Sequence, residues 1–212
     1  MPTTLTPGSD TQTPDWLDNS TSPASRNAWR AWLLECHDAS DGTWVVQYKK
    51  STRMPTVTTD ELVEEAIAFG WIDSTPRKID ADRFAVWCSP RRAGSNWSAL
   101  SKARAQRMTE AGRMTPAGQA AIDRAKADGT WGALESVEAL EVPDDLAAAL
   151  AARPPAAEEF DRFPPSIRRG ILEWVTNAKT DKTRSKRVHE TAFLAEVGKR
   201  ANQWPRQVRL GK

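Results

Sequence analysis

The stretch TTDELVEEAIAFGWIDS, residues 58–74, passes from a helix signal into a strand signal. Thr58 followed by Glu61 forms a capping box, in which each side chain satisfies a backbone N–H at the start of a helix. Apolar residues then recur at helical spacing until Gly70, the residue type that most readily ends a helix. The aromatic and β-branched content of WIDS, residues 71–74, favours a short strand.

Two further segments have the pattern of strands. Residues 43–49, which follow an Asp-Gly turn pair, alternate in the manner of a strand, and residues 83–88, RFAVWC, are rich in aromatic and β-branched side chains. Together with residues 71–74 they predict a small three-stranded antiparallel sheet. We expect this sheet to pack on helices at 26–37 and 59–69.

Nearly all of the chain beyond Pro90 has helical spacing and helix-terminal residues. The expected helices span residues 98–111, Pro116 to Gly129, a short stretch around 146–150, Pro164 to Ala178, and about 183–201. The predicted fold class is therefore α+β: a small antiparallel β-sheet packed with helices, followed by an α-helical C-terminal region.

Composition predicts how the chain is divided. The first residues are mostly Thr, Ser, Pro and Asp, and they have too little apolar surface to offset the entropy of ordering. The expected regions are a disordered tail at 1–24, an α+β core domain at 25–131, an acidic linker at 132–145, a C-terminal helical region at 146–201 and a basic tail at 202–212.

The overall composition is that of a soluble globular protein that is rich in tryptophan. The 212 residues include ten Trp against five Phe and one Tyr, and only two Cys. No stretch approaches the roughly 18–20 apolar residues of a transmembrane segment, and the start of the chain does not have the pattern of a signal peptide. We therefore expect a cytoplasmic protein.

Charge is distributed in blocks. Residues 75–113 have a net charge of +6, residues 128–161 of −8 and residues 179–212 of +7. These blocks either form solvated faces that pair within the molecule or create fields that steer a charged partner.

The common catalytic and cofactor motifs are absent from the sequence. It has neither the GxGxxG nor the GxxxxGK[ST] pattern of nucleotide-binding loops. Its two histidines, His37 and His189, are not spaced as metal ligands, and no GxSxG motif accompanies them. We expect no metal and no cofactor.

Residues 69–98 concentrate tryptophan and arginine, and we predict a ligand site there. Indole rings offer flat apolar faces, and the planar guanidinium grips carboxylate or phosphate groups, so the mixture suits an anionic or aromatic ligand. The alternative is a tryptophan-rich core with arginines packed on the ring faces. The predicted ligand-binding residues are Lys49, Lys50, Trp71, Asp73, Arg83, Arg91, Ser95, Trp97 and Ser98.

Several motifs in a fixed order resemble one bacterial family. They are Trp44 with Lys49-Lys50, FGWIDS at 69–74, SPRR and SNWS within 89–98, GRM at 112–114, AKADGTW at 125–131 and FPPSIRRGILEWVTNAKTDKTRSKRV at 163–188. Over residues 26–198 the chain resembles the YdeI/OmpD-associated family. That resemblance implies a poorly characterised protein of the stress response or of protection against bacteriocins and antimicrobial peptides, and it implies no established reaction.

Three functions follow from these observations. The first is a non-catalytic protein that binds a partner protein, a peptide or a small ligand through its Trp/Arg-rich surface. The second is nucleic-acid binding by the basic helices at 98–113 and 182–201. The third is an enzyme in which Asp73, beside tryptophans, acts as a general acid or base. We expect a binding protein rather than an enzyme.

Overall fold

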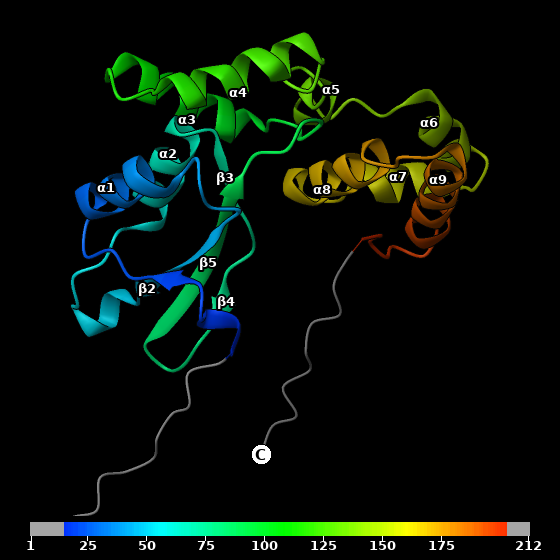
Figure 1. Cartoon of the computed structure of the whole chain (residues 1–212). Coiled ribbons are helices and arrows are strands. Elements are labelled where there is room, and N and C mark those ends of the chain that lie inside the picture. Colours follow the sequence, from blue (N-terminus) through cyan, green and yellow to red (C-terminus); the bar gives the residue numbers. More distant parts are fainter. Residues whose placement is uncertain (1–14, 203–212) are drawn as a thin grey trace, which may run out of the picture. The chain divides into compact units, whose positions relative to one another are not determined.

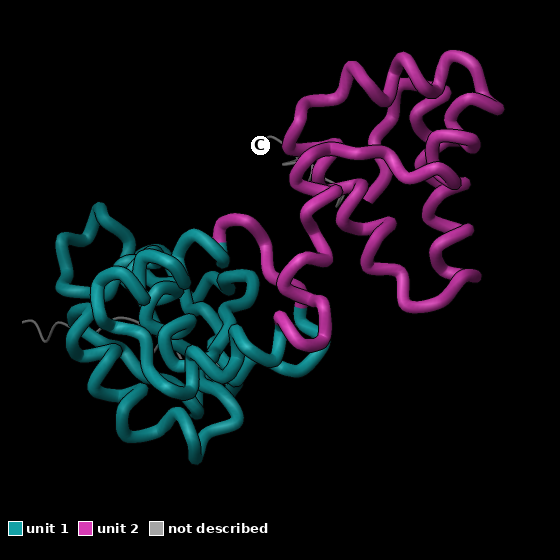
Figure 2. The backbone as a smooth tube through the Cα atoms, turned by 90° about the horizontal axis from the view of Figure 1, so that it is seen from above, with its two compact units in different colours: residues 1–95, 101–125 teal, residues 96–100, 126–212 magenta. Residues whose placement is uncertain are grey.

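A computed structural model describes residues 15–202, which form two compact units (Figures 1 and 2). The first unit takes the chain up to residue 95 together with residues 101–125. The second takes residues 96–100 and everything from residue 126 onward. The boundary therefore crosses the chain at three places rather than at a single linker.

The first unit contains a mixed five-stranded sheet built around one long central strand. The strands are β1 (Ser20–Thr21), β2 (Thr43–Tyr48), β3 (Trp71–Asp73), β4 (Arg77–Lys78) and β5 (Arg83–Pro90). Strands β2, β3 and β4 each pair with β5 in the antiparallel sense. The three predicted strands, together with β4, thus form the antiparallel part of the sheet. Strand β1, which pairs with β2 in parallel, makes the sheet mixed.

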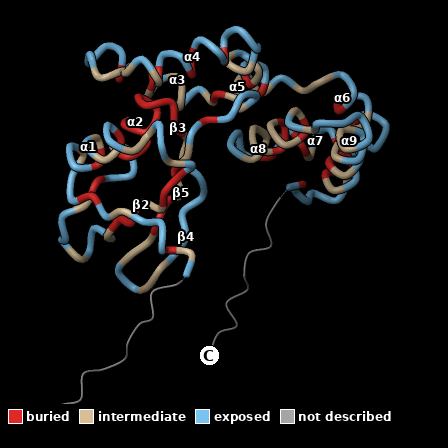
Figure 3. The backbone as a smooth tube through the Cα atoms, viewed as in Figure 1, coloured by how far each residue is buried: buried red, intermediate tan, exposed pale blue. Residues whose placement is uncertain are grey.

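Two helices cover one face of the sheet, and both begin where the sequence predicts. Helix α1 (Arg26–Cys36) starts behind the Ser25 cap, and α2 (Thr59–Ala68) starts with the complete capping box of Thr58. Buried residues gather on α2 and β5 (Figure 3). The indole N–H of Trp29 on α1 donates to the carbonyl of Leu62 on α2 at 3.1 Å, so the two helices are joined within the core.

Two more helices complete the first unit, α3 (Ala99–Glu110) and α4 (Pro116–Ala127). Helix α4 approaches the end of α2 closely, because Gly118 has no side chain. A Cβ atom at Gly118 would lie 2.2 Å from the carbonyl oxygen of Ala68. The first two residues of α3 and the last two of α4 are assigned to the second unit.

The second unit is helical and has its own core. Its helices are α5 (Glu135–Glu138), α6 (Asp144–Ala151), α7 (Ala156–Asp161), α8 (Pro165–Thr176) and α9 (Asp181–Ala195). Phe160, Ile171 and Leu172 are among the residues buried between them. Helix α9 ends at Ala195, six residues before the predicted end, and Gly198 follows with φ +66°.

Two predicted regions differ in the structure. Residues 15–24 were expected to be disordered, but they hold a 3-10 turn, η1 (Asp15–Leu17), and strand β1, with Leu17 buried against the sheet. The segment 132–145 was expected to be a linker, yet it contains α5 and contributes Leu134 and Val137 to the second core. Both differences have the same cause. A few apolar side chains, Leu17 in one segment and Leu134 and Val137 in the other, pack on a core that distant parts of the chain provide.

The rest of the predicted tails, residues 1–14 and 203–212, lies outside the described residues. Between residues 15 and 202 no helix combines the length and apolar character needed to cross a membrane.

Candidate functional site

The outer face of the sheet, opposite α1 and α2, carries tryptophans. Side chains alternate along a strand, so Val45 on β2 points into the core while Trp44 points to the outer face. The register places Trp44 directly opposite Trp87 on β5. Their ring centroids lie 5.4 Å apart at an interplanar angle of 61°, an edge-to-face pair.

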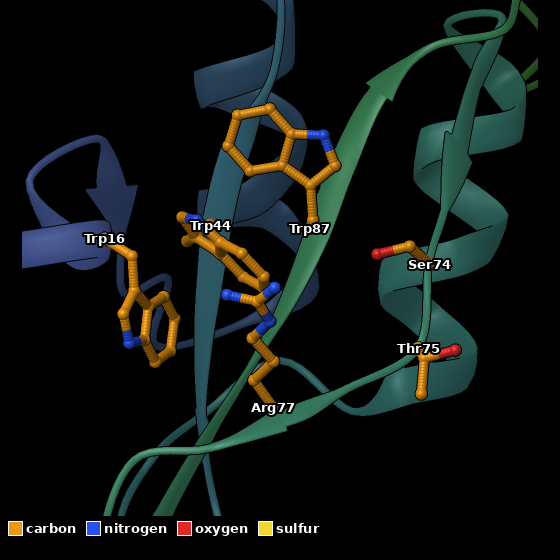
Figure 4. Close-up of a pocket in the computed structure, with 6 residues that line it drawn as sticks. All are labelled: Trp16, Trp44, Ser74, Thr75, Arg77 and Trp87. Atoms are coloured by element: carbon orange, nitrogen blue, oxygen red, sulfur yellow. The ribbon is translucent and has the colours of Figure 1, made fainter. Parts of the chain in front are cut away.

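These two indoles border a pocket of about 610 Å³ that we call the indole pocket (Figure 4). Three tryptophans, two hydroxyl residues and one arginine line it: Trp16, Trp44, Trp87, Ser74, Thr75 and Arg77. A volume of this size holds a small organic ligand, and apolar walls with a few polar groups are typical of ligand sites.

Trp16 closes one side of the indole pocket from the η1 turn. Its ring centroid lies 4.6 Å from that of Trp44 at an angle of 65°. Leu17, the next residue, holds the turn down by packing against Val46 and Ala85 on the sheet. The pocket therefore depends on a segment whose sequence shows no strand or helix pattern.

Trp87 is positioned by a glycine. A Cβ atom at Gly42 would lie 2.3 Å from the Trp87 ring, and Gly42 has φ +146°, which L residues rarely adopt. The indole of Trp87 thus packs directly on the backbone of Gly42. Any side chain at position 42 displaces this wall of the pocket.

Arg77 supplies the charge of the indole pocket. It lies on β4 opposite Ala85, and its guanidinium carbon is 5.1 Å from the Trp44 ring centroid and 5.6 Å from that of Trp16. Within residues 15–202 no carboxylate forms an ion pair with it. The two indoles hold the guanidinium by cation–π contact and leave its N–H groups available.

The residues that the sequence predicted as a ligand site lie in two units. Trp97 and Ser98 belong to the second unit, whereas Trp71, Asp73 and the others belong to the first. Trp71 and Trp97 are each only 1% exposed. Trp71 packs edge-to-face on Trp32 of α1 at 5.8 Å, and Trp97 lies 5.0 Å from the Trp131 ring.

Asp73, the candidate acid or base, ends β3 directly opposite Cys88. Burial raises the pKa of the Cys88 thiol, and the charge of Asp73 raises it further. Burial lowers the pKa of Arg91 to about 10, and the charge of Asp73 partly offsets that fall. Asp73 is thus an electrostatic neighbour of both groups, and its catalytic role stays a prediction.

The remaining predicted residues are distributed along the first unit. The Lys49 ammonium donates to the carbonyl of Ala81, and Lys50 is exposed at the start of a 3-10 turn, η2 (Lys50–Thr52). Arg83 forms an ion pair with Asp80 at 2.8 Å.

Ser95, the last residue of the first segment of the first unit, is half-buried, and its backbone N–H donates to the carbonyl of Arg92 at 3.2 Å. A ligand role for this residue and for those above stays a prediction.

Several arginines of the basic segments form ion pairs within their own unit. On α3, Arg104 binds Asp60 at 2.6 Å and Arg107 binds Glu64 at 2.8 Å. On α9, Arg184 makes two hydrogen bonds to the carboxylate of Asp145, at 2.7 and 2.9 Å. These contacts use part of the positive charge that the nucleic-acid hypothesis requires.

In the sequence, Trp44 lies within the predicted strand 43–49 and Trp87 within RFAVWC, and no local motif joins them into a site. The usable signal was the period of two on each strand, which puts both residues on the solvent side of a sheet. Trp16, Ser74, Thr75 and Arg77 carry no local pattern of this kind. No group of three potential metal-ligating side chains occurs in the part of the chain that the structure describes.

Two protein families match separate parts of the chain. Residues 139–198 match the family described as bacteriocin-protection, YdeI or OmpD-associated, and this partial match supports the predicted resemblance over those residues. Residues 21–121 match a family described as a domain of unknown function (DUF8412). No significant match was found among curated proteins or among solved structures.

Proposed function

We propose, starting from the YdeI/OmpD-associated match at residues 139–198, that this chain is a binding protein of bacteriocin or antimicrobial-peptide protection. Its ligand occupies the indole pocket of the first unit. The family match supports the protective role, and the pocket supports the binding role.

The observation that carries the proposal is the indole pocket itself. Three indole rings and one guanidinium border about 610 Å³ of space on the side of the sheet away from α1 and α2. Large aromatic side chains that remain partly exposed around a concavity are a common basis of ligand recognition. Binding of this kind requires positioned surfaces and no reacting group.

Protection is tested by survival of a bacteriocin-sensitive bacterium that expresses the full chain. The test variant is the double substitution Trp44→Ala with Trp87→Ala, which removes two walls of the pocket. The control is Trp174→Ala, because Trp174 lies in the second unit under Arg187 and does not line the pocket. Soluble protein levels are matched by immunoblotting.

We expect the wild-type chain and the control to increase survival after exposure to the bacteriocin. The increase given by the double variant should be at least tenfold smaller. No gain from the wild-type chain would refute the protective role. An equal gain from the double variant would refute the role of the indole pocket in it.

A further inference from the structure

The charge of the indole pocket selects one kind of ligand. Of the described residues that line it, Arg77 alone is charged, and no carboxylate lines it. A cationic ligand would meet an uncompensated positive charge, whereas an anionic ligand would neutralise it. This inference rests on the proposed function, because it assumes that the pocket is the binding site.

The position of Arg77 favours a planar, two-oxygen partner. Its guanidinium lies over Trp44 and Trp16, and its N–H donors lie in the plane of the group, so contact with the ring faces leaves them free. No hydrogen bond to another described residue uses these donors. A guanidinium already held by two rings loses less entropy when it grips a carboxylate in bidentate fashion.

The other walls suit an aromatic ring attached to that anion. Trp87 offers an indole from the neighbouring strand, and Figure 4 shows it on the same side of the sheet as the Arg77 guanidinium. Figure 4 also shows the Ser74 hydroxyl directed toward this space. Among the described residues this hydroxyl has no partner, so it is available to a ligand oxygen.

We propose that the indole pocket binds an aromatic carboxylate, with the ring packed among the indoles and the carboxylate held by Arg77. Two sources share this chemistry: a small aromatic acid, and the C-terminal carboxylate of a peptide that ends in an aromatic residue. The closest neighbour of Arg77 in the chain, Lys78, provides an internal control. It pairs with Phe84, so its side chain points to the opposite face of the strand.

The test is calorimetric titration of the full chain with three matched probes: 3-phenylpropanoate, the neutral 3-phenylpropanamide and the cationic 3-phenylpropylamine. We expect the carboxylate to bind at least tenfold more tightly than the amide and the amine to bind least. Arg77→Gln should abolish the preference for the carboxylate, and Arg77→Lys should reduce it. Lys78→Gln should leave it unchanged, although it removes the same charge.

A second arm compares Gly-Gly-Gly-Phe with a free C-terminus and the same peptide with an amidated C-terminus. Tighter binding of the free peptide than of 3-phenylpropanoate supports a peptide source, and the reverse order supports a small acid. Gly42→Ala tests the ring subsite without touching Arg77, because its Cβ displaces Trp87. We expect Gly42→Ala to weaken the binding of 3-phenylpropanoate and of 3-phenylpropanamide by a similar factor, so that the preference for the carboxylate is kept.

Three results would overturn the inference: equal affinity for carboxylate and amide, a preference that survives Arg77→Gln, or no binding of any probe. These outcomes are separate from the survival assay. If carboxylate and amide bind equally but protection still depends on the indole pocket, the ligand class alone is refuted. If the carboxylate is preferred but the chain gives no protection, the protective role alone is refuted.

Discussion

Arg113 donates two hydrogen bonds to a single oxygen of Glu65, from Nη2 at 2.6 Å and from Nε at 2.9 Å. Glu65 lies on α2 and its side chain is completely buried. Arg26 and Arg30 of α1 also bind this carboxylate, at 2.6 and 2.7 Å. One buried carboxylate therefore ties both helices that cover the sheet to the turn between α3 and α4.

Replacing Glu65 should strongly destabilise the first unit. Glu65→Gln keeps the size but leaves three arginines without their shared anion, and breaking a buried ion pair costs about 3–5 kcal/mol. The control is Asp60→Asn, which breaks the pair with Arg104 at a side chain that is 80% exposed and should cost less than about 1 kcal/mol. Urea denaturation at pH 7 measures both, and similar losses would contradict the central role of Glu65.

Protonation of Glu65 in acid should lower the free energy of unfolding. Burial acts to raise the pKa of Glu65, but the hydrogen bonds from Arg30, Arg26 and Arg113 outweigh it, so the folded-state pKa is lowered. The contribution of Glu65 is complete above the unfolded-state pKa of about 4.3 and is lost as the pH falls through the lower folded-state pKa. Wild-type unfolding free energy should drop below about pH 5. The curve of Glu65→Gln should be flatter, and parallel curves would refute this assignment.

Two helical glycines should respond in opposite directions to the same substitution. Gly118→Ala places a Cβ 2.2 Å from the Ala68 carbonyl oxygen, and such overpacking typically costs about 1–3 kcal/mol. Gly170→Ala on α8 meets no atom within 4 Å and should gain about 0.5–1 kcal/mol from helix propensity. Thermal melts followed by circular dichroism show both shifts. A stabilising Gly118→Ala would mean that α2 and α4 are not in close contact.

Trp97→Ala should act on stability, because the Trp97 side chain is only 1% exposed. Loss of a core tryptophan costs about 3–5 kcal/mol, whereas a ligand-facing one costs much less. Unfolding by guanidinium chloride provides the measurement. If Trp97→Ala unfolds at the same denaturant concentration as the wild type, the ligand role predicted from the sequence gains support.

Leu17→Ala should show that the segment before α1 contributes to the fold. Leu17 is buried with Val46 and Ala85, so the truncation should cost about 2–3 kcal/mol. Leu34→Ala is the matched control, because that side chain is 60% exposed and its loss should change stability by less than about 0.5 kcal/mol. Equal melting temperatures for the two variants would contradict the anchoring role of Leu17.

The helices and the central strands could be predicted from the sequence because their signals are local. The Ser25 cap and the Thr58 capping box place two helix starts correctly, since a cap acts within one turn of the backbone. Period-two alternation placed β2 and the aromatic, β-branched content placed β5, within one or two residues of their ends. Ordering of η1 and the docking of α5 have no such local signal, because each depends on a surface formed by distant residues.

The site divides along the same line. Residue order alone shows that tryptophan and arginine gather between residues 69 and 98, and that a run of motifs resembles one family. Which indoles share a surface depends on the fold. Strand register sets Trp44 opposite Trp87, and the η1 turn and strand β4 bring Trp16 and Arg77 beside them. Trp71 and Trp97 are each only 1% exposed. The spacing of residues along the chain indicates which side chains share a face of a strand or helix. Whether that face is buried depends on which elements pack on it in the folded protein.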